Sequence, residues 1–101
     1  ERDGTITQFV SCLQRAWHAG ASSYGGRSDC NDFSIGVELE GADTVPYTPA
    51  QYESLLVLTR GLMSAYPDIT PHRITGHEFI APGRKSDPGP AFDWERFYAS
   101  L

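Results

Sequence analysis

The chain has little positive charge, few cysteines and no long hydrophobic run. Its 101 residues include 8 Lys and Arg against 13 Asp and Glu, which gives a formal net charge of −5. Because binding to nucleic-acid phosphates needs clustered Lys and Arg, this balance argues against a nucleic-acid partner. No apolar run approaches the length of a transmembrane helix, so we expect no membrane segment.

Only two cysteines are present, Cys12 and Cys30. They are compatible with a disulfide without implying one, and two free thiols in a cytosolic protein are the more frequent case. A chain of 101 residues, 40% of them hydrophobic, is large enough for one domain with a single core. We therefore expect one globular domain at most.

Residues 75–90 place several chemically active side chains on a stiff backbone. The segment contains His77, Lys85 and Asp87 among three prolines and three glycines. Proline fixes φ and glycine permits positive φ, so this composition predicts a shaped loop without helix or strand. Imidazole and carboxylate are ligands that Zn²⁺ accepts, and loops of this kind often carry sites. The alternative is a proline-rich connector with solvated charges.

The clearest strand pattern covers residues 33–39, where apolar and polar side chains alternate. Glu38 and Glu40 lie on the polar face near the end of this segment, where Gly41 ends the pattern. Carboxylates at the end of a central strand are candidate general bases, because burial and a nearby cation can tune their pKa. The alternative is a solvated edge strand.

A long helix is predicted to begin after Thr48, which can act as N-cap with Pro49 in the first turn and Gln51 completing a capping box. Pro67 should end it, and a second helix should begin near Asp93. The helical spacing of the first helix places one face toward the core. That face consists of Tyr52, Leu55, Leu56, Thr59, Leu62, Met63 and Tyr66.

The start of the chain has the Asp3-Gly4 pair that is typical of a two-residue hairpin turn, followed by a strand-like pattern over residues 5–10. Only Glu1 and Arg2 precede this turn, and a hairpin needs two arms. We therefore expect the chain to begin inside a domain. The alternative is a frayed start without a hairpin.

A polar segment at residues 21–32 is predicted to be a loop without secondary structure, and long loops of this kind are often functional. Trp17 and His18 lie at its beginning, where they could stack on a sugar or bind a peptide. The alternative places Trp17 in the core with His18 as its satisfied partner. His72, which precedes a short predicted strand, is expected on the surface rather than at a site.

Four segments resemble, in order and over the length of the chain, the AmpD-type 1,6-anhydro-N-acetylmuramyl-L-alanine amidases. They are RAWHAG at 15–20, CNDFSIGVELEG at 30–41, TGH at 75–77 and KSDPGPAFDW at 85–94. This branch belongs to the zinc N-acetylmuramoyl-L-alanine amidases, which include phage amidases and peptidoglycan recognition proteins. The resemblance implies an α/β fold in which a mixed β-sheet is flanked by helices, with Zn²⁺ in a cleft at one side.

The same resemblance implies hydrolysis of the amide between the lactyl group of muramic acid and L-alanine, in the cytoplasm, on anhydromuropeptides recovered from the cell wall. We expect the protein to be a monomer. By position, His77 and Asp87 match two zinc ligands, Glu38 matches the glutamate at the catalytic water, and Lys85 matches the lysine beside the oxyanion. The positions that match the family's substrate cleft are Trp17, Ala19 and Leu39. We include His18 with them, because it lies between Trp17 and Ala19.

Two features depart from the family pattern. The first zinc histidine of the family lies on a strand ahead of the Asp-Gly turn, and neither His18 nor His72 is in a motif that replaces it. We therefore expect the chain to be the C-terminal two-thirds of one amidase domain, incomplete at its N-terminus and inactive alone. The branch also often has arginine before Cys-Asn-Asp, where this chain has Asp29 and the nearest cation is Arg27.

Two other functions stay open at this point. The first is a zinc-free module of the same fold that binds muropeptide or peptidoglycan. Such modules typically lack a metal ligand, whereas this chain has His77, Asp87, Glu38 and Lys85 together. The second is a short protein with an unrelated role.

Overall fold

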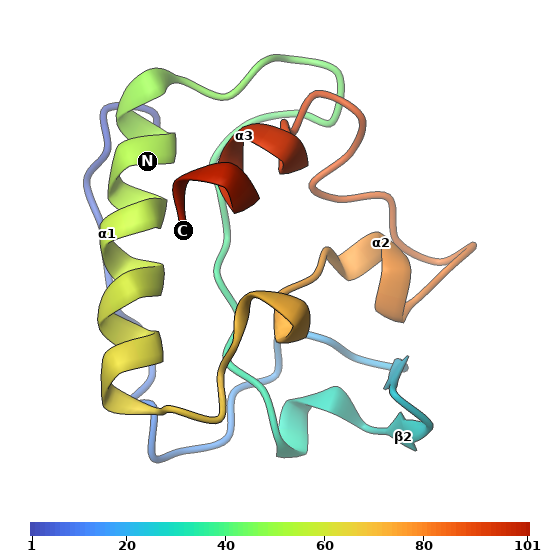
Figure 1. Cartoon of the computed structure of the whole chain (residues 1–101). Coiled ribbons are helices and arrows are strands. Elements are labelled where there is room, and N and C mark those ends of the chain that lie inside the picture. The colour runs from blue at the N-terminus through green and yellow to red at the C-terminus, as the bar shows by residue number, and fades with distance from the viewer.

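The computed structural model describes all 101 residues, and Figure 1 shows one long helix with the shorter helices and a small hairpin to one side of it. The elements, in chain order, are β1 (Ser23–Tyr24), β2 (Arg27–Ser28), the 3-10 helix η1 (Cys30–Asp32), α1 (Pro49–Ala65), the 3-10 helix η2 (Pro71–Arg73), α2 (His77–Ile80) and α3 (Trp94–Ser100). Extended segments and turns connect them. None of the helices is both long enough and apolar enough to cross a lipid bilayer.

Helix α1 begins with the predicted capping box. The Thr48 hydroxyl accepts a hydrogen bond from the Gln51 backbone N–H at 3.1 Å, and the Gln51 side chain accepts one from the Thr48 N–H at 2.9 Å. These bonds satisfy two N–H groups that the first turn leaves without helical partners. The helix ends before Pro67, as predicted, and most of its expected apolar face is buried or half-buried, although Tyr66 is exposed.

The core is a small aromatic cluster between α1 and α3, which lie beside each other in Figure 1. Its centre is Phe92, whose ring centroid lies 4.7 Å from that of Trp94 and 5.4 Å from that of Tyr52. Edge-to-face and tilted aromatic pairs stabilise such clusters beyond the apolar area they bury. Helix α3 begins at the predicted place, because the Asp93 carboxylate accepts the Arg96 N–H at 2.9 Å.

The strands predicted over residues 5–10 and 33–39, and the short one leading to His77, are wrong. The only sheet is the pair β1–β2. Residues 33–39 are not paired with a neighbour, and Ile35 and Val37 on their apolar face are exposed. An alternating pattern gives a segment one apolar face. A strand also needs a neighbouring segment to pair with its N–H and C=O groups, and no other segment here provides one.

Two segments predicted as loops contain regular structure. Within residues 21–32, β1 and β2 pair antiparallel across Gly25 and Gly26, whose φ values of 56° and 83° suit a two-residue hairpin turn. Within residues 75–90, α2 forms one helical turn. Its four residues contain neither proline nor glycine, so the local composition permits this turn inside a segment that is otherwise rich in both.

The Asp3-Gly4 pair forms a turn, as predicted, but no hairpin follows it. The Gly4 N–H donates to the Glu1 carbonyl at 3.0 Å, and Gly4 has a φ of 91°. The turn docks on α1, where the Ser54 hydroxyl donates to the Gly4 carbonyl at 2.6 Å. A Cβ atom at Gly4 would lie 2.9 Å from that hydroxyl, so this close approach requires glycine.

Candidate active site

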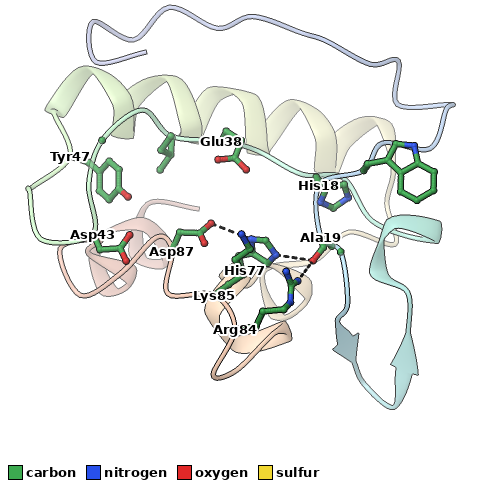
Figure 2. A pocket seen from close by; sticks show the side chains of 13 residues that line it. His18, Ala19, Glu38, Asp43, Tyr47, His77, Arg84, Lys85 and Asp87 are labelled. Carbon is green, nitrogen blue, oxygen red and sulfur yellow. Dashed lines mark hydrogen bonds and ion pairs between the residues drawn. The ribbon is translucent and has the colours of Figure 1, made fainter.

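All eight residues selected from the sequence line one pocket of about 370 Å³, although they come from four separate segments (Figure 2). They are Trp17, His18, Ala19, Glu38, Leu39, His77, Lys85 and Asp87. Five further residues complete the lining: Gly20, Gly41, Asp43, Tyr47 and Arg84. The pocket therefore combines three carboxylates, two imidazoles and two cations with an exposed aromatic ring.

His77 and Asp87 face each other in this pocket. His77 is the first residue of α2, and Asp87 lies on the loop that follows the helix. The Asp87 carbonyl accepts the Glu78 N–H at 2.9 Å, which ties this loop back to α2. As a result, the His77 Nδ1 atom lies 3.3 Å from the Asp87 Oδ2 atom. His77 is largely covered, whereas Asp87 is open to solvent on one side.

The second ring nitrogen of His77 determines the tautomer. The Nε2 atom lies 2.9 Å from the Ala19 carbonyl oxygen, which carries no hydrogen, so Nε2 must be the donor. In the neutral imidazole, Nδ1 then presents a lone pair to the Asp87 carboxylate. Two acceptors at this distance repel each other unless a proton or a cation lies between them.

A zinc ion fits this pair of donors. Ligand bonds of about 2.0–2.2 Å in a tetrahedral site place neighbouring donor atoms about 3.3–3.5 Å apart, close to the separation observed here. A zinc-binding histidine usually donates its other N–H to a carbonyl or carboxylate, as His77 does to Ala19. The chain supplies only two such donors, since no group of three His, Cys, Asp or Glu residues is placed to hold a metal.

The Ala19 peptide is held on both sides. Its N–H donates to the buried Asn31 Oδ1 atom at 2.7 Å, and its carbonyl also accepts the Arg84 Nη2 atom at 2.6 Å. Arg84 bonds the Ala21 carbonyl as well, at 2.8 Å from Nη2. No role for Asn31 or Arg84 was predicted from the sequence. Asn31 accepts a backbone N–H and Arg84 donates to backbone carbonyls, and no side-chain pattern reports such groups.

Glu38 reaches the pocket because the chain before it packs closely on His18. A Cβ atom at Gly36 would lie 2.5 Å from the His18 ring, so only glycine permits this contact. Two residues later, the Glu38 carboxylate points into the space beside His77 and Asp87 (Figure 2). Glu40 does not line the pocket, and its carbonyl instead accepts the Gln51 side chain at 2.8 Å.

Trp17 is 85% exposed, so the alternative that places it in the core is wrong. The Arg15 guanidinium lies 4.0 Å from the centroid of its ring and bonds the Asp32 carboxylate at 2.6 Å. His18 lies beside it, with its Nε2 atom 3.2 Å from the Ser34 hydroxyl. His72 is exposed and outside the pocket, as expected.

Asp43 and Tyr47 form the opposite wall of the pocket, and neither was predicted from the sequence. Tyr47 is buried, and its hydroxyl donates to the Pro88 carbonyl at 2.9 Å. Burial raises the pKa of this hydroxyl, and the negative charges of Asp43 and Asp87 raise it further. Both residues follow the Glu-Leu-Glu-Gly motif closely, so their place near the site could have been anticipated from sequence proximity.

Comparison with known proteins agrees with this geometry. A family model described as N-acetylmuramoyl-L-alanine amidase matches residues 1–90. The chain is 62% identical over 100 residues to the 1,6-anhydro-N-acetylmuramyl-L-alanine amidase AmpD of Enterobacter cloacae, covering 99% of this chain and 53% of that protein. The N-acetylmuramoyl-L-alanine amidase AmiD of Escherichia coli is 39% identical over 100 residues, covering 90% of this chain and 36% of AmiD.

Solved structures give the same result. A selenomethionine derivative of AmpD superposes with a TM-score of 0.95 at 59% identity, covering 99% of this chain and 55% of that chain. AmiD from E. coli in complex with anhydro-N-acetylmuramic acid-L-Ala-D-gamma-Glu-L-Lys superposes with a TM-score of 0.86 at 38% identity, covering 95% of this chain and 40% of that chain.

These superpositions confirm the predicted amidase fold, although the only sheet in this chain is the two-stranded pair β1–β2. The chain spans about half the length of the AmpD proteins that it matches. The family model covers the aromatic cluster only in part but includes every residue of the pocket. From the family model and the identity to AmpD together, we conclude that this chain belongs to the N-acetylmuramoyl-L-alanine amidase family.

Proposed function

We propose that the protein containing this chain hydrolyses the amide between the lactyl group of 1,6-anhydro-N-acetylmuramic acid and the L-alanine of muropeptides, in cell-wall recycling. The observation that supports this function best is the convergence of His77 and Asp87, as facing donors, in one pocket with Glu38 and Lys85. The similar proteins named as amidases of this bond, and the AmiD complex with an anhydromuropeptide, support the same substrate class.

The proposed cofactor is Zn²⁺, held by His77 through Nδ1 and by the Asp87 carboxylate. When bound, the ion would supply Lewis-acid chemistry and lower the pKa of water to about 7. Catalytic zinc sites usually have three protein ligands. The expectation that a third ligand comes from residues outside Glu1–Leu101 stays a prediction, and with it the expectation that these 101 residues alone are inactive.

Glu38 and Lys85 carry the acid–base and charge-stabilising roles in this proposal. The Glu38 carboxylate accepts a proton from the attacking water and then delivers it to the L-alanine nitrogen as the carbon–nitrogen bond breaks. The Lys85 ammonium group stabilises the negative charge that develops on the former carbonyl oxygen, since a fixed positive charge acts most strongly where the reaction creates a negative one. The products are the free lactyl carboxylate and a peptide with a free N-terminus.

Trp17 and its neighbours are the proposed substrate contacts. One side of the exposed Trp17 ring carries the Arg15 guanidinium, and the ring lies at the edge of the pocket. An exposed aromatic face of this kind offers apolar surface to a sugar ring. His18, Ala19 and Leu39 line the same pocket. A monomeric state and a cytoplasmic location belong to the same proposal and rest on the resemblance to AmpD.

The test uses the full-length protein and 1,6-anhydro-N-acetylmuramyl-tripeptide, with mass spectrometry to detect the released tripeptide. We expect release by the zinc-loaded protein, loss of release after treatment with a chelator, and recovery when Zn²⁺ is restored. Binding of the muropeptide without any release, unchanged by the chelator, would contradict the proposal and favour a zinc-free binding module.

A further inference from the structure

The loop that carries Lys85 and Asp87 has no strand or helix to hold it between residues 84 and 93. On one side it is tied to α2, where the Asp87 carbonyl accepts the Glu78 N–H. The Lys85 N–H donates at 3.0 Å to the carbonyl of Ala81, the residue that follows this helix. These bonds fix one edge of the loop. The position of the Asp87 carboxylate also depends on what holds the other edge.

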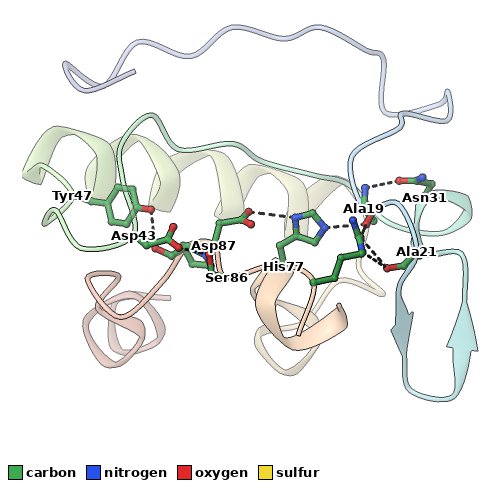
Figure 3. A network of polar contacts seen from close by, with 10 residues as sticks. Ala19, Ala21, Asn31, Asp43, Tyr47, His77, Ser86 and Asp87 are labelled. Atoms are coloured by element: carbon green, nitrogen blue, oxygen red, sulfur yellow. Dashed lines mark hydrogen bonds and ion pairs between the residues drawn. The ribbon is translucent and has the colours of Figure 1, made fainter. Parts of the chain in front are cut away.

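The other edge is held by the wall of the pocket that contains Asp43 and Tyr47 (Figure 3). The Ser86 hydroxyl donates a hydrogen bond to the Asp43 carboxylate. The Tyr47 hydroxyl donates to the Pro88 carbonyl at 2.9 Å. The residues immediately before and after Asp87 are therefore both bonded to the same wall.

The backbone of Asp43 makes a third connection to this loop. Its carbonyl accepts the Ala91 N–H at 3.1 Å. The two segments also approach so closely at Gly89 that a Cβ atom there would lie 2.5 Å from the Asp43 Cβ atom. Gly89 has a φ of 78°, which glycine adopts without strain. The contact between the two segments thus depends on both Asp43 and the glycine opposite it.

We propose that Asp43 is a positioning residue for the zinc-binding loop, holding Asp87 and Lys85 in place through its bond to Ser86, an inference that rests on the function proposed above. Asp43 is not itself a metal ligand in this arrangement, because no third carboxylate, imidazole or thiol is placed to bind a metal together with His77 and Asp87. Its bond to Ser86 is open to solvent, so it contributes modestly to folding. The main effect of this bond is to fix the position of the loop that carries Lys85 and Asp87.

The test compares Asp43→Ala, Ser86→Ala and the double variant in the full-length protein. Groups that orient metal ligands typically change metal affinity or activity by about 10–100-fold when removed, and we expect about tenfold weaker retention of Zn²⁺ against a chelator for each single variant. We expect kcat to fall and KM to change little, because the affected groups act on the reaction rather than on substrate binding. The double variant should be no worse than either single one, since both remove the same bond.

Two further variants separate positioning from general effects. Asp43→Asn keeps an oxygen that can accept the Ser86 hydroxyl, so it should remain within about twofold of the unchanged protein in Zn²⁺ retention. Glu53→Ala removes the same charge from an exposed position on α1 and should change neither zinc retention nor kcat. Additive losses in the double variant, or unchanged zinc retention and kcat in Asp43→Ala, would overturn the proposal.

Hydrogen exchange of the Glu78 amide tests the same inference without metal or substrate. This N–H donates to the Asp87 carbonyl, so a loosened loop should expose it, and we expect about threefold or more faster exchange in Asp43→Ala and Ser86→Ala. Unchanged exchange in both variants would overturn the positioning role. If the unchanged protein neither binds Zn²⁺ nor hydrolyses muropeptide, the proposed function fails, and this exchange measurement still decides the role of Asp43.

Discussion

The Nδ1 atom of His77 lies 3.3 Å from the Oδ2 atom of Asp87, while its Nε2 atom donates to the Ala19 carbonyl. This arrangement turns the free lone pair of the imidazole toward a carboxylate. It is unfavourable for two neutral or negative acceptors and favourable around a cation. The relationship therefore links the backbone at Ala19, 58 residues away in sequence, to the chemistry proposed for the pocket.

Glu38 should be the carboxylate that transfers the proton. In the full-length protein, Glu38→Gln should keep its zinc and lower kcat by about 10²-fold or more, in line with general acid–base contributions. Glu40→Gln is the matched control and should have a smaller effect, because Glu40 lies outside the pocket. Steady-state kinetics with metal analysis checks both variants. Equal losses of kcat would show that the wrong carboxylate was chosen.

Lys85 should stabilise the developing oxyanion. Replacing it in Lys85→Met should lower kcat by about 10²–10³-fold, the range typical of a lost oxyanion donor. Arg73→Met removes one positive charge from an exposed residue of η2 and provides the control. A rise in KM alone, with kcat unchanged, would assign Lys85 to substrate binding instead.

Asn31 should stabilise both the fold and the orientation of His77. Asn31→Ala leaves the Ala19 N–H without its partner at a buried position, and we expect a loss of about 1–3 kcal/mol in the free energy of unfolding. Zinc retention should weaken as well, because the Ala19 carbonyl that orients His77 is no longer fixed. Chemical denaturation and chelator competition measure the two effects. A loss of stability without any change in zinc retention would separate Asn31 from the site.

Tyr47 should make stability depend on alkaline pH. Burial raises the pKa of its hydroxyl above the usual value, and burial does the same for Tyr98. A raised pKa in the folded state gives stabilisation that is complete below about pH 10, the ordinary pKa of tyrosine, and is lost as the pH rises through the folded-state value. The free energy of unfolding should therefore fall above about pH 10.

The variant Tyr47→Phe should lose about 0.5–1.5 kcal/mol at neutral pH, because the bond to the Pro88 carbonyl is absent. Its stability should fall less steeply above about pH 10 than that of the unchanged protein, with the remaining slope owing partly to Tyr98. Tyr66→Phe, at the exposed end of α1, is the control. Parallel pH curves for the unchanged protein and Tyr47→Phe would contradict the assignment.

The sequence predicted those parts of the molecule whose signals are local. Helix α1 was predicted with its capping box because Thr48, Pro49 and Gln51 act within one turn. The pocket residues were selected because a stiff loop carries His77, Lys85 and Asp87, and because their motifs resemble those of a known family. Their convergence in one pocket then followed from the fold.

The parts that were missed depend on contacts between distant segments. Residues 33–39 have a strand pattern, but pairing requires a neighbouring strand, which a local pattern cannot guarantee. The Ala19 carbonyl is a backbone group, and its roles toward His77 and Arg84 leave no trace in the residue type. Asp43 acquires its partner only because Gly89 lets two loops touch.

The most direct test of the central claim is the zinc content of the full-length protein, measured by elemental analysis after dialysis, for the unchanged protein, His77→Ala, Asp87→Ala and Glu53→Ala. Because His77 and Asp87 are the proposed ligands, we expect one Zn²⁺ per chain in the unchanged protein and in Glu53→Ala, and a nearly complete loss in the other two variants. Folding of each variant is verified by circular dichroism. Full zinc content in folded His77→Ala or Asp87→Ala, or zinc-independent hydrolysis by the unchanged protein, would contradict the account.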